Sequence, residues 1–274
     1  MSDLLISLVV RALNAAGTLD QVLGALDRRP GDQLLVVDSG STDATLEIAR
    51  RHGAEVVGLA PGTFTYGRAL NAGFAAARND WVLVLSAHTV PIPPDFLARY
   101  RAAIRRFPAE VTAAVGPLVT ADFDSPLPGG ITLFRQGDFD RGFGFAAGNP
   151  NCLYRRDAWR ARPFDEALGG GEDLQWYVQA LAAGETIAAV HGATVRYLAR
   201  QSWRASYRKG RVDYRAAARL IQPHATGLGG LLIRAAKLVL YAALGRIHPR
   251  EARNSLAHCL GNWAEARALR RGSG

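Results

Sequence analysis

Short apolar runs alternate with amphipathic segments along the first 116 residues. The runs predict buried strands at 4–10, 33–38, 54–58, 81–85 and 111–116. The segments between them predict helices at 18–26, from a Ser41 or Thr42 cap to about Arg51, at 67–78 and at 95–106. This alternation predicts an α/β fold, a parallel sheet with helices on both faces. Ligands of such sheets bind beyond the carboxyl ends of the strands, so we expect a site formed by residues 11–17, 38–43 and 86–91.

The pattern changes after residue 116. Residues 117–151 are rich in Gly, Pro, Phe and Asp without helical or strand periodicity, which predicts an irregular lobe or a substrate loop. A helix is predicted at 172–184, and short strands at 187–190 and 194–197.

A different signal begins at residue 200. Six arginines are spaced by three or four residues, which places them on one face of a helix; they are Arg200, Arg204, Arg208, Arg211, Arg215 and Arg219. Residues 228–244 are strongly apolar but contain Arg234 and Lys237, as in helices that lie in a membrane interface. The C-terminal part therefore predicts a basic, amphipathic helical extension.

Composition excludes several classes of protein. The 274 residues are 49% hydrophobic and 21% charged, so the chain is neither disordered nor fibrous and is long enough to bury a core. Cys152 and Cys259 are the only cysteines, which supports no disulfide framework or cysteine zinc site and favours the reduced cytoplasm.

The net charge of +9 is unevenly distributed. Residues 196–274 carry 16 basic and 3 acidic side chains, whereas residues 1–195 carry 17 basic and 21 acidic ones. A polycationic segment favours phosphate-bearing partners such as an anionic membrane surface. We expect no nucleic-acid partner, because no recognition motif is present and the preceding residues are net acidic.

Asp38 ends a buried strand and is followed by a Gly-Ser turn, so its carboxylate can accept hydrogen bonds from a base or a ribose. An ordinary strand-to-helix turn is the competing interpretation of this segment alone. No G-x-G-x-x-G or phosphate loop is present. Five further segments follow a fixed order with it: 7–14 (SLVVRALN), 67–73 (GRALNAG), 81–91 (WVLVLSAHTVP), 164–166 (FDE) and 171–176 (GEDLQW).

Across residues 5–220 these six segments resemble the family 2 glycosyltransferases, inverting nucleotide-sugar enzymes with the A-type fold. The resemblance implies a Rossmann-like, mostly parallel sheet in a glycosyltransferase domain at 1–222. Residues 1–116 would bind the nucleotide sugar and residues 117–222 the acceptor, followed by an extension at 223–274 that lies on a membrane or packs on the domain.

The implied activity is transfer of one sugar from a nucleotide-diphosphate donor (UDP, GDP or dTDP) to a hydroxyl acceptor. From the basic extension we expect a lipid-linked or cell-surface acceptor and a peripheral location at the inner face of the cytoplasmic membrane. A nucleotide-sugar-binding protein without turnover is the alternative.

The resemblance also assigns roles. Asp173 matches the general base that deprotonates the acceptor, with Glu172 as the other candidate, although any helix start favours acidic residues. Trp176, one turn further, is the expected acceptor contact. The expected donor-binding residues are Arg11, Ala12, Asn14, Asp38, Ser39, Arg68, Asn71, Ser86, Ala87 and His88.

One departure concerns the metal. Members of this family usually end the fourth strand in Asp-x-Asp, which holds a divalent cation, whereas this chain has Ser86-Ala87-His88. Mn²⁺ or Mg²⁺ remains possible, but both prefer oxygen ligands, so His88 alone makes a poor metal site. We hypothesise that His88, Arg68, Arg204 and Arg208 stabilise the diphosphate instead; the arginine stripe could equally face lipid headgroups.

Overall fold

The computed structural model describes residues 4–119, 129–138, 150–198, 202–220, 236 and 249–271. The chain forms two compact units, Met1–Leu198 and Ala199–Gly274. Arg200 and, apart from residue 236, the apolar segment 228–244 lie outside the described residues.

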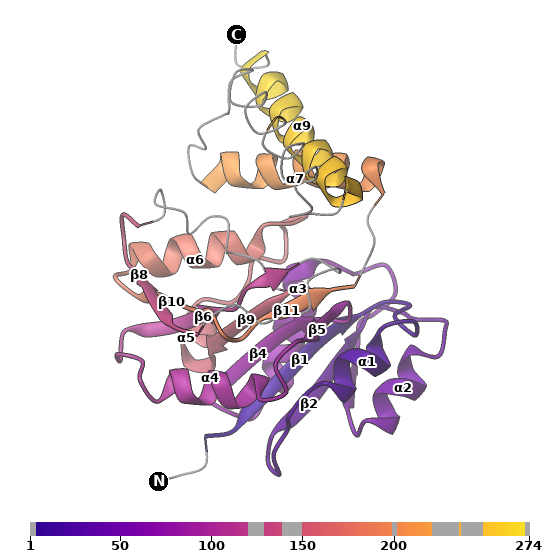
Figure 1. Ribbon diagram of the computed structural model, residues 1–274, viewed down its shortest axis with the longest axis vertical. Coiled ribbons are helices and arrows are strands. Elements are labelled where there is room, and N and C mark those ends of the chain that lie inside the picture. Colours follow the sequence, from indigo (N-terminus) through magenta and orange to yellow (C-terminus); the bar gives the residue numbers. More distant parts are fainter. Residues whose placement is uncertain are drawn as a thin grey trace. The chain divides into compact units, whose positions relative to one another are not determined.

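The first unit is built on an eight-stranded sheet with the order β3-β2-β1-β4-β9-β6-β10-β8 (Figure 1). Strands β9 and β8 are antiparallel to their neighbours, and the other adjacent pairs are parallel. This confirms the predicted α/β fold and its mostly parallel sheet. The strands are β1 (Ile6–Ala12), β2 (Gln33–Asp38), β3 (Glu55–Gly58), β4 (Trp81–Ser86), β6 (Val111–Val115), β8 (Ile131–Phe134), β9 (Asn151–Arg155) and β10 (Thr186–Val190).

Helices cover both faces of this sheet. One face packs on α1 (Leu19–Gly24), α2 (Thr45–Arg51) and α4 (Phe96–Ile104), and the other on α3 (Tyr66–Ala76), α5 (Arg156–Ala161) and α6 (Glu172–Ala182). Side chains of a strand alternate between these two cores, so Leu8 and Val10 face the first core and Val9 the second. Val9 packs so closely on Gly73 of α3 that a Cβ at Gly73 would lie 2.5 Å from it.

A second, three-stranded sheet has the order β5-β11-β7. Its strands are β5 (Thr89–Pro91), β11 (Val195–Tyr197) and β7 (Leu118–Val119). The backbone amide of Leu198 donates to the carbonyl of His88 at 2.7 Å. The end of the first unit therefore lies beside the loop that follows β4.

Two local predictions are wrong. Helix α2 begins at Thr45, because the Ser41 side chain and the Thr42 amide bond to Asn14 in place of capping the helix. The region predicted as irregular, 117–151, contains β7 and β8, and the unpredicted strand β9 starts at its last residue. β9 lies between β4 and β6, so its hydrogen bonds are all long-range and leave no periodic signal in so short a run.

The second unit contains α7 (Trp203–Leu220) and α9 (Pro249–Arg271), which pack on each other. The predicted helix of spaced arginines is thus present as α7. The two backbones approach closely at two glycines: a Cβ at Gly210 or at Gly261 would lie 2.1 Å from a carbonyl oxygen of the other helix. The predicted division at residue 222 differs from these contacts, which group α7 with α9.

Two arginines of the predicted stripe are used inside this pair of helices. Arg211 and Arg215 donate through their Nε atoms to Glu265 of α9, at 2.7 and 2.8 Å, and Glu265 is buried. They are therefore held by a carboxylate, whereas the sequence left the whole stripe open to phosphates. In the parts of the chain that are described, no helix combines the length and apolar character needed to cross a membrane.

Candidate active site

The loops after β1 and β2 are tied together at the carboxyl edge of the sheet. Ser41 Oγ accepts from the Asn14 amide, and Asn14 Oδ1 accepts from the Thr42 amide, both at 2.9 Å. Asp43 accepts from the Ala16 amide at 3.0 Å. Asn14 adopts a left-handed conformation, φ +46°, which Asn tolerates better than most residues. Two loops thus form one preshaped wall.

Asp38 lies at the base of this wall. It is buried, and its carboxylate accepts from the backbone amides of Gly40 and Ser41 at 3.0 to 3.2 Å. Gly40 has φ +100°, so a side chain there would be strained. The Ser39 amide donates to the Ala12 carbonyl at 3.1 Å, which joins the β1 and β2 ends. A carboxylate has about four acceptor positions, so Asp38 can still accept from a ligand.

The loop after β4 places His88 against α1. Thr18 Oγ1 donates to the Ala87 carbonyl at 2.7 Å, and His88 Nδ1 lies 3.2 Å from the same hydroxyl. Because the hydroxyl proton is on Ala87, we assign the Nδ1–H tautomer, which leaves Nε2 as an acceptor. Burial lowers the pKa of His88 below its usual 6.5. The free side chain is therefore neutral at pH 7, which argues against the predicted cationic role of His88.

Arg11 and the rings of Tyr66 and Phe64 form a second group of side chains in this region. Arg11 is paired in register with Val37 of β2 and Ser86 of β4. Its guanidinium carbon lies 5.2 Å from the centroid of the Tyr66 ring, which itself meets the Phe64 ring edge-on. Both rings are more than 40% exposed, so they are not packed in the core. The sequence feature that could have indicated Tyr66 as a site residue is its position directly before the motif that starts at Gly67.

Arg68 and Asn71 are bound to another part of the chain. Arg68 Nε donates to Glu166 at 2.9 Å. The Asn71 amide group donates to the Phe164 carbonyl and to Glu166, and its oxygen accepts from the Phe164 amide and from Trp159. Four hydrogen bonds to three residues satisfy the Asn71 side chain. Asn71 therefore positions residues 164–166, and no contact with a nucleotide sugar is needed to explain it.

Helix α6 begins with two acidic residues after Gly171, which has φ +80°. Glu172 is buried, whereas Asp173 is partly exposed and accepts from the Leu174 amide at 2.7 Å. Burial, and then the charges of Cys152, Asp173 and Glu172, raise the pKa of Tyr154 on β9. The first turn of α6 therefore lies over the α3 face of the sheet, the face that Arg11 also occupies.

Trp176 is a core residue of the first unit. It is 1% exposed, its Nε1 donates to the Arg162 carbonyl at 2.8 Å, and its ring packs on Tyr154 and Phe164. The expectation that Trp176 binds the acceptor is wrong, because the apolar stripe of α6 turns this ring into the core.

Arg204 and Arg208 belong to the second unit, not to the set that the first unit gathers at its sheet edge. With Trp203 and Tyr207 they line a shallow groove of about 390 Å³ on α7. Two aromatic rings and two guanidinium groups thus share this surface.

The residues after β4 do not fit a divalent metal. Ser86 offers a hydroxyl and His88 a single imidazole nitrogen, whereas Mg²⁺ and Mn²⁺ prefer several carboxylate or carbonyl oxygens. Among the described residues, no group of three His, Cys, Asp or Glu side chains could hold a metal ion.

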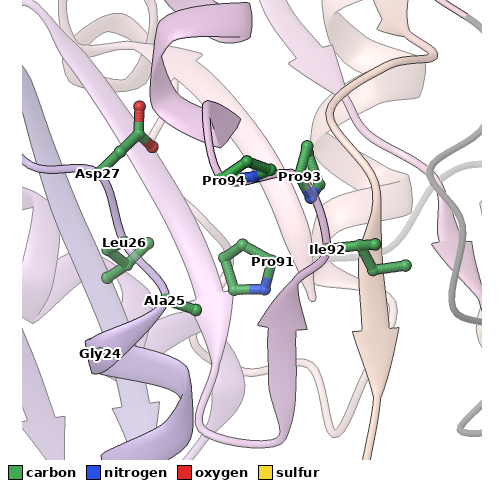
Figure 2. A pocket seen from close by; sticks show the side chains of 8 residues that line it. All are labelled: Gly24, Ala25, Leu26, Asp27, Pro91, Ile92, Pro93 and Pro94. Atoms are coloured by element: carbon green, nitrogen blue, oxygen red, sulfur yellow. The ribbon is translucent and has the colours of Figure 1, made fainter.

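Another hollow lies between the segment Gly24–Asp27, which begins at the last residue of α1, and the segment Pro91–Pro94 (Figure 2). Its one charged side chain, Asp27, accepts from the Leu97 and Ala98 amides at 2.6 and 3.1 Å. Asp27 therefore caps the start of α4, and the hollow shares no lining residue with the site described above.

Comparison with known proteins agrees with this geometry. Residues 7–159, more than half of the chain, match the model of the family described as Glycosyl transferase family 2. The chain belongs to this family. Over 83 residues this family 2 glycosyltransferase is 42% identical to uncharacterized glycosyltransferases of Mycobacterium tuberculosis and Mycobacterium bovis. The matched segment spans 30% of this chain and 36% of those relatives, about a third of their length.

Several solved structures share the fold. The mannosyltransferase PcManGT from Pyrobaculum calidifontis, in complex with GDP-Man and Mn²⁺, has a TM-score of 0.66 at 17% identity, covering 96% of this chain and 86% of that one. S. aureus TarS 1–349 in complex with UDP-GlcNAc has a TM-score of 0.61 at 15% identity, covering 97% and 92%. Glucosyl-3-phosphoglycerate synthase from Mycobacterium tuberculosis has a TM-score of 0.59 at 20% identity, covering 83% and 84%.

Proposed function

We propose that this chain transfers one sugar from a nucleotide-diphosphate donor to a hydroxyl acceptor, with inversion at the anomeric carbon. The observation that carries the proposal is the preshaped wall at the carboxyl ends of β1 and β2, with buried Asp38 at its base. Asp38 would accept from the nucleoside. The candidate donors are sugars carried on UDP, GDP or dTDP. GDP-Man and UDP-GlcNAc are bound by two proteins of the same fold.

Asp173 is our candidate general base. Its exposure distinguishes it from Glu172, which is buried and less able to reach an acceptor hydroxyl. In the proposed step the acceptor proton passes to Asp173 while the acceptor oxygen bonds to the anomeric carbon and the nucleoside diphosphate leaves. One displacement inverts the configuration.

Nucleotide binding gives the first test. A bound nucleotide raises the unfolding temperature by mass action, so UDP, GDP and dTDP are titrated, each with Mn²⁺ or with EDTA. We expect one of them to stabilise the wild type and the shift to vanish in Asp38→Ala. No shift with any nucleotide would contradict the proposal.

Turnover gives the second test. With the nucleotide thus identified, Asp173→Asn should reduce release of nucleoside diphosphate from its sugar donors by roughly a hundredfold or more, while nucleotide binding is retained. Glu172→Gln, the matched change next to it, should reduce turnover much less. A wild type that binds nucleotide but releases none from any donor and acceptor would favour the non-catalytic alternative.

We also propose that α7 places the protein on an anionic membrane surface that carries a lipid-linked acceptor. The supporting observation is the groove in which Arg204 and Arg208 flank Trp203 and Tyr207, since aromatic rings and basic side chains favour the headgroup region. Arg204→Ala/Arg208→Ala should lose sedimentation with phosphatidylglycerol vesicles. Arg253→Ala/Arg267→Ala, the same charge change on α9, is the control. Equal loss in both variants would contradict a specific role of the groove.

A further inference from the structure

We propose that Arg11 binds the diphosphate of the donor and supplies the positive charge that the residues after β4 do not. This inference rests on the proposed nucleotide-sugar function and goes beyond it, because it names the group that replaces a metal ion at the leaving group.

The position of Arg11 fits this role. It pairs in register with Ser86 at the carboxyl edge of the sheet, and its carbonyl accepts from the Ala87 amide at 3.1 Å. Strand side chains alternate between faces, so Arg11 follows Val9 on the face covered by α3 and α6. The guanidinium therefore lies at the carboxyl edge on the α3 face of the sheet, beside the Tyr66 ring.

The hydrogen-bond state of Arg11 indicates a missing partner. Its Nε and Nη1 atoms are buried and have no hydrogen-bond partner among the described residues. Buried polar atoms are almost always hydrogen-bonded, and a guanidinium keeps its charge at any physiological pH. A guanidinium carries five N–H donors and binds phosphate oxygens through charge-assisted hydrogen bonds. An anion with several oxygens at this edge, such as a diphosphate, would satisfy the orphan donors.

The neighbouring side chains that could otherwise bind the diphosphate do not supply a free positive charge. Arg68 is bound to Glu166, and His88 is neutral at pH 7 because burial lowers its pKa. The Asp38 carboxylate is held by the Gly40 and Ser41 amides. Arg11 is held by the Tyr66 ring, which orients a cation without neutralising it. Its full charge thus stays available for a ligand.

The experiment compares nucleoside diphosphates with monophosphates in EDTA. Calorimetry with UDP and UMP, with GDP and GMP, and with dTDP and dTMP measures how much the second phosphate adds to affinity. In the wild type we expect the diphosphate to bind more tightly than the monophosphate. Losing charge-assisted hydrogen bonds to phosphate corresponds to about ten- to a hundredfold in affinity, so Arg11→Met should lower diphosphate affinity by this factor and leave monophosphate affinity nearly unchanged.

Two further variants keep the test independent of folding. Tyr66→Ala changes an exposed ring, so the fold should persist, and the diphosphate preference should fall because the guanidinium is no longer held. Arg78→Met removes an exposed arginine that pairs with Glu55, away from the carboxyl edge, and should bind like the wild type.

The failures of the two proposals are distinguishable. If the wild type binds none of UDP, GDP and dTDP, the proposed function is wrong. If it binds one of them and both Arg11→Met and Tyr66→Ala keep the full diphosphate preference, Arg11 does not bind the diphosphate and only this inference is overturned. A diphosphate preference that appears only when Mn²⁺ replaces EDTA overturns it as well.

Discussion

The side-chain oxygen of Asn14 lies 2.9 Å from the backbone nitrogen of Thr42, so a residue after β1 holds the loop after β2. Asn14 also has a left-handed backbone, at φ +46°. The shape of the proposed nucleoside wall therefore depends on a residue that supplies both an acceptor and an unusual backbone conformation.

Replacing Asn14 should loosen this wall. Asn14→Ala adds backbone strain and removes the acceptor for Thr42, which together should cost about 1 to 3 kcal/mol of unfolding free energy. Urea unfolding measures this cost, and nucleotide titration should show weaker binding. Asn14→Gly also removes the acceptor but adds no backbone strain, so it should be more stable than Asn14→Ala yet still bind weakly. Wild-type affinity in both variants would refute the link between wall and site.

Asn71 should matter for stability more than Arg68 does. Asn71→Leu leaves the Trp159 Nε1 and the Phe164 amide without their acceptor, which should cost about 2 to 4 kcal/mol. Arg68→Met breaks an ion pair whose side chains are 43% and 39% exposed, so its cost should stay below about 1 kcal/mol. Denaturant unfolding of the two variants compares them directly. The reverse order would contradict a positioning role for Asn71.

His88 gives a pH dependence with a defined sign. Burial lowers the folded-state pKa of His88 below 6.5. As the pH falls, His88 is therefore protonated in the unfolded chain before it is protonated in the folded chain. The unfolding free energy of the wild type relative to His88→Gln should be constant above about pH 7. It should fall as the pH drops below 6.5 toward the folded-state pKa. Urea unfolding from pH 8 to pH 5 tests this, and a pH-independent difference would show that burial does not perturb His88.

Glu265 is an acidic group in the second unit whose pKa is also lowered. Burial tends to raise its pKa, but the hydrogen bonds from Arg211 and Arg215 outweigh burial and lower the pKa below its usual 4.5. The stabilisation of α7 and α9 by this group is therefore present above about pH 4.5 and is lost as the pH falls through the folded-state pKa.

Glu265→Gln should consequently speed amide exchange of residues 203–220 and 249–271 at pH 7. The difference from wild type should shrink as the pH is lowered to 3, because the fraction of Glu265 that is protonated and uncharged grows as the pH falls. Arg253→Gln, an exposed change on the same helix, is the control. An equal difference at both pH values would mean that the charge of Glu265 does not hold the two helices together.

The sequence by itself determined the alternating strands and helices and the family, and it predicted a site at the carboxyl edge of the sheet. Apolar runs such as 33–38 are long enough, and bounded clearly enough, to be recognised locally. Asp38 and Asp173 were predicted as site residues because each stands at a strand end or a helix start within an ordered set of motifs. These are properties of neighbouring residues, which one chain displays without its fold.

Only the tertiary structure decided the roles that depend on distant partners. β9 became central because β4 and β6 flank it, and Trp176 became a core residue because Arg162 and Tyr154 surround it. Asn71 is satisfied by residues about ninety positions away, whereas Arg11 keeps buried donors for which the described residues provide no acceptor. Burial and hydrogen-bond satisfaction are sums over neighbours in space, so the order of residues alone could not supply them.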